Sequence, residues 1–163
     1  MLRISKLTDY GTVVLAHLAK NPASVCSAAE VAGVTGIAPP TVSKLLKSLA
    51  RSGLVLSTRG ANGGYQLARG PQDISAADII DALEGPVSIT ECSARDSLCE
   101  HEDVCSVGNS WQRINVAIRR ALDDVTLSDL LRTNTAVPQF HFSGLPVNVD
   151  IMNYHHGYRF RTY

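Results

Sequence analysis

Three cysteines with the spacing of a ligand set lie in the second half of the chain. Cys92, Cys99 and Cys105 fall within fourteen residues, with six and then five residues between them. This spacing lacks the paired C-x2-4-C knuckles and the four protein ligands that are typical of a structural zinc site. Three thiolates in a flexible loop suit an iron–sulfur cluster, whose irons are usually held by cysteines. The residues alone leave an iron–sulfur cluster, a zinc site and a bare thiol switch as open interpretations.

A metal or cluster held by three cysteines needs a fourth ligand. Cys26 stands alone after Val25, and we expect it to be a small buried hydrophobic residue. Asp9 lies near the start of the first expected helix, where its charge also stabilises the helix dipole. The local candidates are Glu91, His101, Glu102 and Asp103, and the distant ones are Cys26 and, from a second subunit, Asp9.

The net charge is zero, but basic and acidic residues are concentrated in different parts of the chain. Residues 1–70 carry 8 basic and 2 acidic residues, whereas residues 71–131 carry 4 basic and 12 acidic ones. A basic part followed by an acidic part is typical of a polyanion-binding domain joined to another unit. We expect a DNA-binding domain over 1–70, a linking helix, cysteine loop and dimerisation helix over 71–132, and a mobile tail over 133–163.

The sequence shows no sign of membrane insertion, export or catalysis. No apolar run approaches the roughly 18 residues of a membrane span, and Asp9 interrupts any signal-peptide core after Arg3 and Lys6. We therefore expect a cytoplasmic protein without membrane contact, in a compartment where structural disulfides are rare. No nucleophile–base pair, no glycine loop joined to a Walker lysine and no metal-and-base motif is present, so we expect neither an enzyme nor a small-molecule substrate.

The first third of the chain predicts a helix-turn-helix. One helix is expected over residues 8–20 with Thr8 as its cap, and a short second helix opens at Ser27, where Glu30 completes a capping box. After a turn, a third helix is expected over residues 39–51, because its initial prolines are tolerated in a first turn. Such a third helix is the one that enters the major groove of DNA.

The expected third helix has two distinct faces. Its apolar face follows helical spacing and comprises Val42, Leu45, Leu46 and Leu49. Its polar, basic face comprises Thr41, Ser43, Lys44, Lys47, Ser48 and Arg51. We expect the apolar face to pack on the domain and the basic face to contact DNA.

A hairpin is expected directly after the third helix. Strands over residues 54–58 and 65–67 flank a glycine-rich turn over residues 60–64. A hairpin at this place is a wing, and Arg59 stands at its tip, where a cation can enter a narrow minor groove. The glycines that let the backbone approach phosphates are Gly60, Gly63 and Gly64. Together with the helix-turn-helix, the wing predicts binding to double-stranded DNA.

The acidic part of the chain predicts a helix for assembly. Ser75 and Asp78 open a fourth helix, and a long helix is expected over residues 107–124, followed by a short one that Thr126 caps. The apolar seam of the long helix comprises Trp111, Ile114, Ile118, Leu122 and Val125. Its spacing suits a partner helix, so we expect a homodimer; the alternative is a helix that folds back on its own domain. Two recognition helices about one DNA turn apart predict a near-palindromic operator.

Several motifs resemble a known family. These are the opening Leu2-Arg3-Ile4-Ser5-Lys6-Leu7-Thr8-Asp9-Tyr10-Gly11, the wing Arg59-Gly60-x-x-Gly63-Gly64-Tyr65, the three cysteines and the ending Thr126-Leu127-x-Asp129-Leu130. They are similar to the IscR- and NsrR-type winged-helix repressors over about residues 1–132. The opening most resembles the branch that regulates SUF-type iron–sulfur assembly genes.

The resemblance implies a mainly α winged helix-turn-helix protein with a two-stranded β wing, a cysteine-bearing loop and a long dimerisation helix. It also implies a homodimeric, cytoplasmic bacterial repressor whose iron–sulfur cluster, held by the three cysteines, sets its affinity for DNA. One branch has a ligand histidine where this sequence has Gly108, while the nitric-oxide-sensing branch uses an acid that Asp9 matches. Clusters of the [2Fe-2S] and the [4Fe-4S] type, and a response to nitric oxide, therefore stay open.

Overall fold

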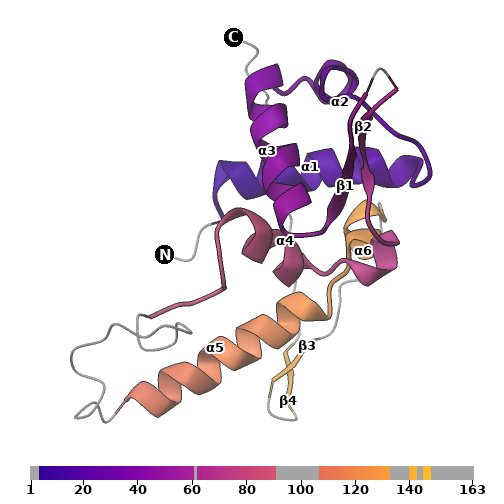
Figure 1. The fold of residues 1–163 in the computed structure, drawn as a ribbon. Helices are drawn as coiled ribbons and strands as arrows, with labels where there is room; N and C mark the ends of the chain where they lie inside the picture. The colour runs from indigo at the N-terminus through magenta and orange to yellow at the C-terminus, as the bar shows by residue number, and fades with distance from the viewer. Residues whose placement is uncertain (1–3, 61, 91–106, 133–139, 143–144, 148–163) are drawn as a thin grey trace, which may run out of the picture. The chain divides into compact units, whose positions relative to one another are not determined.

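The computed structural model consists of two compact units, residues 1–132 and residues 133–163. The first unit is mainly helical with one two-stranded sheet, which confirms the expected fold class (Figure 1). Its elements are α1 (Lys6–Lys20), α2 (Ala28–Thr35), α3 (Pro39–Arg51), β1 (Val55–Thr58), β2 (Gly64–Leu67), η1 (Pro71–Asp73), α4 (Ala76–Leu83), α5 (Gly108–Asp123) and α6 (Leu127–Leu131). The structure describes residues 4–60, 62–90, 107–132, 140–142 and 145–147.

Helix α1 begins earlier than its sequence predicts. The Ser5 hydroxyl accepts hydrogen bonds from the backbone N–H groups of Leu7 and Thr8, at 3.2 and 3.3 Å, and so caps the helix. The predicted cap, Thr8, is wrong: this residue lies inside α1, is 4% exposed and donates its hydroxyl to the Glu84 carboxylate. Serine and threonine have similar preferences as caps, so the distant partner of Thr8 decides which residue caps α1.

The three other capped helices begin where their sequences predict. In each, a hydroxyl accepts from the third N–H of the helix, and an acid at that third position accepts from the cap N–H. The pairs are Ser27 with Glu30 in α2, Ser75 with Asp78 in α4, and Thr126 with Asp129 in α6. Helix α3 has no such cap and starts with its two prolines, as predicted.

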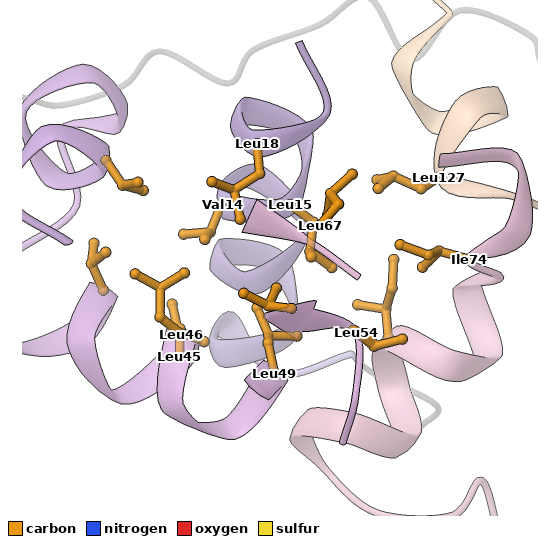
Figure 2. Close-up of a cluster of buried hydrophobic side chains, with 14 of the residues drawn as sticks. Val14, Leu15, Leu18, Leu45, Leu46, Leu49, Leu54, Leu67, Ile74 and Leu127 are labelled. Atoms are coloured by element: carbon orange, nitrogen blue, oxygen red, sulfur yellow. The ribbon is translucent and has the colours of Figure 1, made fainter. Parts of the chain in front are cut away.

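A single aliphatic core joins most of these elements. Figure 2 shows side chains of α1, α3, strand β2 and the residue before β1 converging, and they include Val14, Leu15, Leu18, Leu45, Leu46, Leu49, Leu54 and Leu67. Ile74 and Leu127 are fully buried in the same core, so the boundary expected at residue 70 falls inside one compact unit. Truncation of one such leucine to alanine typically costs about 2–5 kcal/mol of stability.

The wing is anchored close to its turn by a third segment. Strands β1 and β2 pair antiparallel, from Val55 opposite Leu67 to Thr58 opposite Gly64. The segment before α2 joins β2, because Cys26 N–H donates to the Tyr65 carbonyl at 2.9 Å and Tyr65 N–H donates to the Cys26 carbonyl at 2.8 Å. Cys26 packs against the core as a hydrophobic residue, as expected, but it is half-buried rather than buried.

The chain that follows α5 returns to the core. Ala76 N–H donates to the Val125 carbonyl and Leu127 N–H donates to the Ile74 carbonyl, both at 2.7 Å. These two bonds form a short bridge between the start of α4 and the start of α6. The C-terminal end of α5 is thereby fixed to the same unit that carries α3.

The second unit contains two short strands that we did not expect. Strand β3 (Phe140–Phe142) pairs antiparallel with β4 (Leu145–Val147). The apolar residues of this region show no sustained alternation, and three-residue strands are too short to produce one.

In the described ranges of the chain, no helix is both long and apolar enough to span a membrane.

Candidate nucleic-acid interface

Helix α3 presents a row of exposed basic side chains. Lys44, Lys47 and Arg51 are all exposed, and their spacing places them along one side of the helix. No described carboxylate lies within ion-pair distance of any of the three. Thr41 and Ser43 are half-buried beside them. Since the predicted apolar face of α3 is fully buried, this basic side is available to phosphates and base edges.

Ser48 does not belong to the exposed basic side of α3. Its hydroxyl donates to the carbonyl of Ala82 in α4 at 3.0 Å, and the residue is half-buried. The prediction that Ser48 faces solvent is therefore wrong. The helical repeat places residue 48 between the two faces, and α4 covers that side of the helix.

The wing tip combines an exposed cation with a turn that only glycine can make. Arg59 is exposed directly after β1, and Gly60 has a φ of 122°. A Cβ on Gly63 would lie 2.3 Å from the Thr58 carbonyl oxygen, and one on Gly64 would lie 2.6 Å from the Cys26 carbonyl oxygen. The wing thus requires these two glycines for its own backbone, besides any approach to phosphate.

The expected cluster ligands are only partly described. Cys92, Cys99 and Cys105 lie outside the described residues, between α4 and α5, and the four local candidates for a fourth ligand lie outside them too. Asp9 is exposed in the first turn of α1, and its carboxylate has no partner among the described side chains. Within the described part of the chain, no three His, Cys, Asp or Glu side chains are grouped to hold a metal ion. By its chemistry, a set of three thiolates fits an iron–sulfur cluster.

An ion pair joins α4 to α5. Arg119 donates to both oxygens of Asp81, from Nη1 at 3.1 Å and from Nη2 at 2.7 Å. Asp81 also accepts from Val87 N–H at 3.2 Å, and Asn115 donates to the Val87 carbonyl at 3.2 Å. The hydrogen bonds that Arg119 donates to the Asp81 carboxylate raise the pKa of Arg119. No local pattern predicts this contact, because its partners are 38 residues apart.

Glu84 joins the end of α4 to the start of α1. Its carboxylate accepts the Thr8 hydroxyl and, at 3.1 Å, the Ser5 N–H. The bond from Thr8 is the main reason that the pKa of Glu84 is lowered, while partial burial opposes the shift. The helix that carries Asp9 is therefore held at its first turn by α4.

We expect this carboxylate to stabilise the fold in a pH-dependent way. Because the pKa of folded Glu84 lies below its ordinary 4.5, the unfolded chain takes up the proton first as the pH falls. The contribution of Glu84 to the free energy of unfolding is complete above the pKa of the unfolded chain. It is lost as the pH falls through the lowered pKa of the folded protein. In urea titrations, Glu84→Gln should be less stable than wild type at neutral pH and should lose less stability on acidification.

The control for this prediction is Asp124→Asn, which removes an exposed carboxylate without a described side-chain partner. It should keep the wild-type dependence of stability on pH. A Glu84→Gln curve parallel to that of the wild type would contradict the role of the Thr8 bond.

The fold and this surface define a class of protein. Helix α2 ends at Gly36 in the left-handed conformation, a tight turn leads into the basic helix α3, and a two-stranded wing follows. This arrangement is that of a winged-helix DNA-binding protein. The chain belongs to the Rrf2 family, described as iron-dependent transcriptional regulators, whose model matches residues 4–133. It is accordingly a DNA-binding transcription regulator.

Individual relatives agree with this assignment. The protein rrf2 of Nitratidesulfovibrio vulgaris is 32% identical over 142 residues, which cover 85% of this chain and 93% of the relative. The solved structure of CymR, the global cysteine regulator of Bacillus subtilis, is 36% identical with a TM-score of 0.62, covering 80% of this chain and 97% of that one. The structure of T. potens IscR is 34% identical with a TM-score of 0.58, covering 80% and 86%.

Proposed function

We propose that this regulator is a cytoplasmic repressor of SUF-type iron–sulfur assembly genes that senses an iron–sulfur cluster at Cys92, Cys99 and Cys105. The observation that carries the proposal is the place of the three cysteines in the chain. They lie between α4, which contacts the recognition helix α3, and α5, which presents an unpartnered apolar surface. Resemblance of the opening and the wing to the IscR-type repressors, and the likeness to an IscR structure, support the same assignment.

The four ligands proposed for the cluster are the three cysteines and Asp9 of a second subunit. When bound, an iron–sulfur cluster supplies a group whose oxidation state and integrity respond to iron, oxygen and nitric oxide. Asp9 suits the fourth position because it is exposed and unpartnered among the described residues. A carboxylate is a harder and weaker ligand than a thiolate, so the iron that it holds should be labile.

A second function is favoured by the CymR relatives. The B. subtilis protein is a global cysteine regulator, and one solved structure is the oxidized form of Staphylococcus aureus CymR, 30% identical with a TM-score of 0.57. In this alternative, the three cysteines act as a thiol switch or hold zinc, and no cluster is bound.

Anaerobic purification separates the two functions. Visible absorption with stoichiometric iron and acid-labile sulfide, lost in Cys99→Ala, is the result expected for the cluster regulator. Colourless protein whose DNA affinity changes between dithiothreitol and an oxidant would instead establish the thiol switch. Cys26→Ala serves as the matched control, because Cys26 joins strand β2 only through backbone hydrogen bonds and its side chain should not affect either signal.

The ligand from Asp9 has its own test in a mixed dimer. One chain carries Asp9→Ala, and the other has its three cluster cysteines replaced. If Asp9 acts in trans, this dimer retains one complete site, whereas ligation within a chain leaves none. His101→Ala is the control and should keep the wild-type spectrum. A colourless mixed dimer of folded subunits would refute ligation in trans.

Dimerisation is proposed to use the seam of α5. No described residue of α5 is buried, and Trp111 and Ile114 remain 39% and 44% exposed. Ile118 and Leu122 of the same seam are half-buried and face a cavity that Ile80 of α4 also lines. The seam therefore divides into a part turned toward α4 and an exposed part that is left for a partner helix.

Ile114→Glu is expected to produce monomers. It places a charge in the exposed part of the seam, and an unpaired charge in an apolar interface costs several kcal/mol. Sedimentation velocity should show half the wild-type mass and a loss of affinity for a palindromic duplex. Val116→Glu, an equally exposed position outside the seam, should stay dimeric. A dimeric Ile114→Glu protein would exclude this seam as the contact.

A further inference from the structure

Two consecutive residues of α4 contact the two helices that matter most for DNA binding. The side chain of Asp81 holds Arg119 of α5 through two hydrogen bonds. The carbonyl of the next residue, Ala82, accepts the hydroxyl of Ser48 in the recognition helix α3. A short polar path therefore runs from α5 through one turn of α4 to α3.

The apolar contact between α4 and α5 is open to solvent on one side. A pocket of about 470 Å³ borders this junction, and Ile80, Val87, Ile118 and Leu122 are among the residues that line it. Apolar packing on that side therefore fixes α5 less closely than a fully packed junction would. The position of α5 on α4 then depends on directional hydrogen bonds. The bidentate pair between Arg119 and Asp81 restricts the relative orientation of the two side chains.

The bond between Asp81 and Arg119 is better suited to positioning than to stability. The two side chains are 29% and 34% exposed, and ion pairs with this exposure stabilise proteins only modestly. The Asp81 carboxylate also holds the Val87 N–H, whose carbonyl is held by Asn115 of α5. These bonds fix α5 and the chain that leaves α4 with respect to the same carboxylate.

We propose that Asp81 is a positioning residue that fixes the recognition helix α3 relative to α5. The inference rests on the proposed dimerisation through α5. In such a dimer, the connection from α5 through α4 to α3 in each subunit sets the distance between the two recognition helices. Loss of this connection therefore affects the simultaneous binding of two half-sites and leaves the binding of one half-site intact.

The variant that tests this inference is Asp81→Asn. Asparagine is isosteric and can still accept from Val87 N–H, but it loses the charge that pairs with Arg119. The probes are a duplex selected by the wild-type protein from a random-sequence pool and the same duplex with one half-site scrambled. We expect affinity for the full site to fall roughly tenfold, with affinity for the half-site unchanged within about twofold.

Two further variants make the test specific. Arg119→Ala should have the same effect as Asp81→Asn, and the double variant should lose no more than either single one, because both remove one link. Asp123→Asn removes the more distant carboxylate, 3.9 Å from Arg119, and should bind both duplexes like the wild type. Equal losses on the full site and the half-site, or additive losses in the double variant, would overturn the inference.

The outcome also distinguishes this inference from the proposed dimer. A wild-type preference for the full site that survives unchanged in Asp81→Asn overturns the positioning role and leaves the dimer intact. A wild-type protein that binds both duplexes equally well contradicts the proposed dimer, and the positioning role falls with it. A preference for the full site that is lost in the variant supports both.

Discussion

Replacement of Lys44 and Lys47 together by glutamate is expected to weaken binding to duplex DNA by about a hundredfold or more at moderate salt. Both side chains are exposed on the outer side of α3, and neither has a described ion-pair partner. Each lost phosphate contact lowers the slope of log K against log salt by about 0.9. The two acids also add repulsion, so the variant should bind more weakly and depend less on salt than the wild type.

The measurement is a series of binding isotherms at several salt concentrations. The charge-matched control is Arg113→Glu with Arg120→Glu, since both arginines are exposed on the side of α5 opposite its apolar seam. This control should retain nearly wild-type affinity and slope. The free energy of unfolding of both double variants should lie within about 0.5 kcal/mol of the wild-type value, because the replaced side chains lie on the surface. Equal losses in the two proteins would show that only net charge matters and that α3 is not the interface.

Gly64→Ala is expected to destabilise the protein by about 1–3 kcal/mol and to weaken DNA binding at the same time. The added Cβ would lie 2.6 Å from the oxygen and 2.8 Å from the carbon of the Cys26 carbonyl. Both are backbone atoms, so the bridge between Cys26 and Tyr65 must open or the wing must move. Arg59 at the wing tip moves with it, which links the stability of this turn to recognition of DNA.

Thermal unfolding with a parallel binding assay measures both effects. The matched control is Gly33→Ala in α2, where the added Cβ would meet no atom within 4 Å. Alanine is the better residue inside a helix, so this variant should gain about 0.5–1 kcal/mol and bind DNA normally. A Gly64→Ala protein with the melting temperature of the wild type would show that the wing tolerates a side chain at this position.

The parts of the fold that short-range chemistry determines were predictable. The capping boxes of α2, α4 and α6 require two residues three positions apart, and all three are present. The buried face of α3 follows from helical spacing, and its four apolar residues are fully buried. The wing follows from two short strands and the glycines between them, although β2 begins one residue before its predicted start. Each of these features depends on neighbours within one or two turns of chain.

The contacts that the sequence could not predict join residues far apart in the chain. Thr8 is a suitable cap by residue type, but its hydroxyl donates to Glu84, 76 residues away. Ser48 belongs to the polar set of α3 until α4 covers it. No periodicity or motif in the sequence predicts the bond between Asp81 and Arg119. For Thr8 and Ser48 the side chain had two acceptable local uses, and the tertiary packing decided between them.

The return of the chain to the core at Leu127 has a consequence for the way the protein is made. Leu127 is fully buried beside the residues that support α3, and its N–H bonds to Ile74. During synthesis, the core beneath the recognition helix stays incomplete until residue 127 has left the ribosome, by which time all three cysteines have also emerged. A nascent or prematurely ended chain that stops before that point lacks a finished core. Such a fragment should therefore hold α3, with its exposed basic side, less stably than the full chain does.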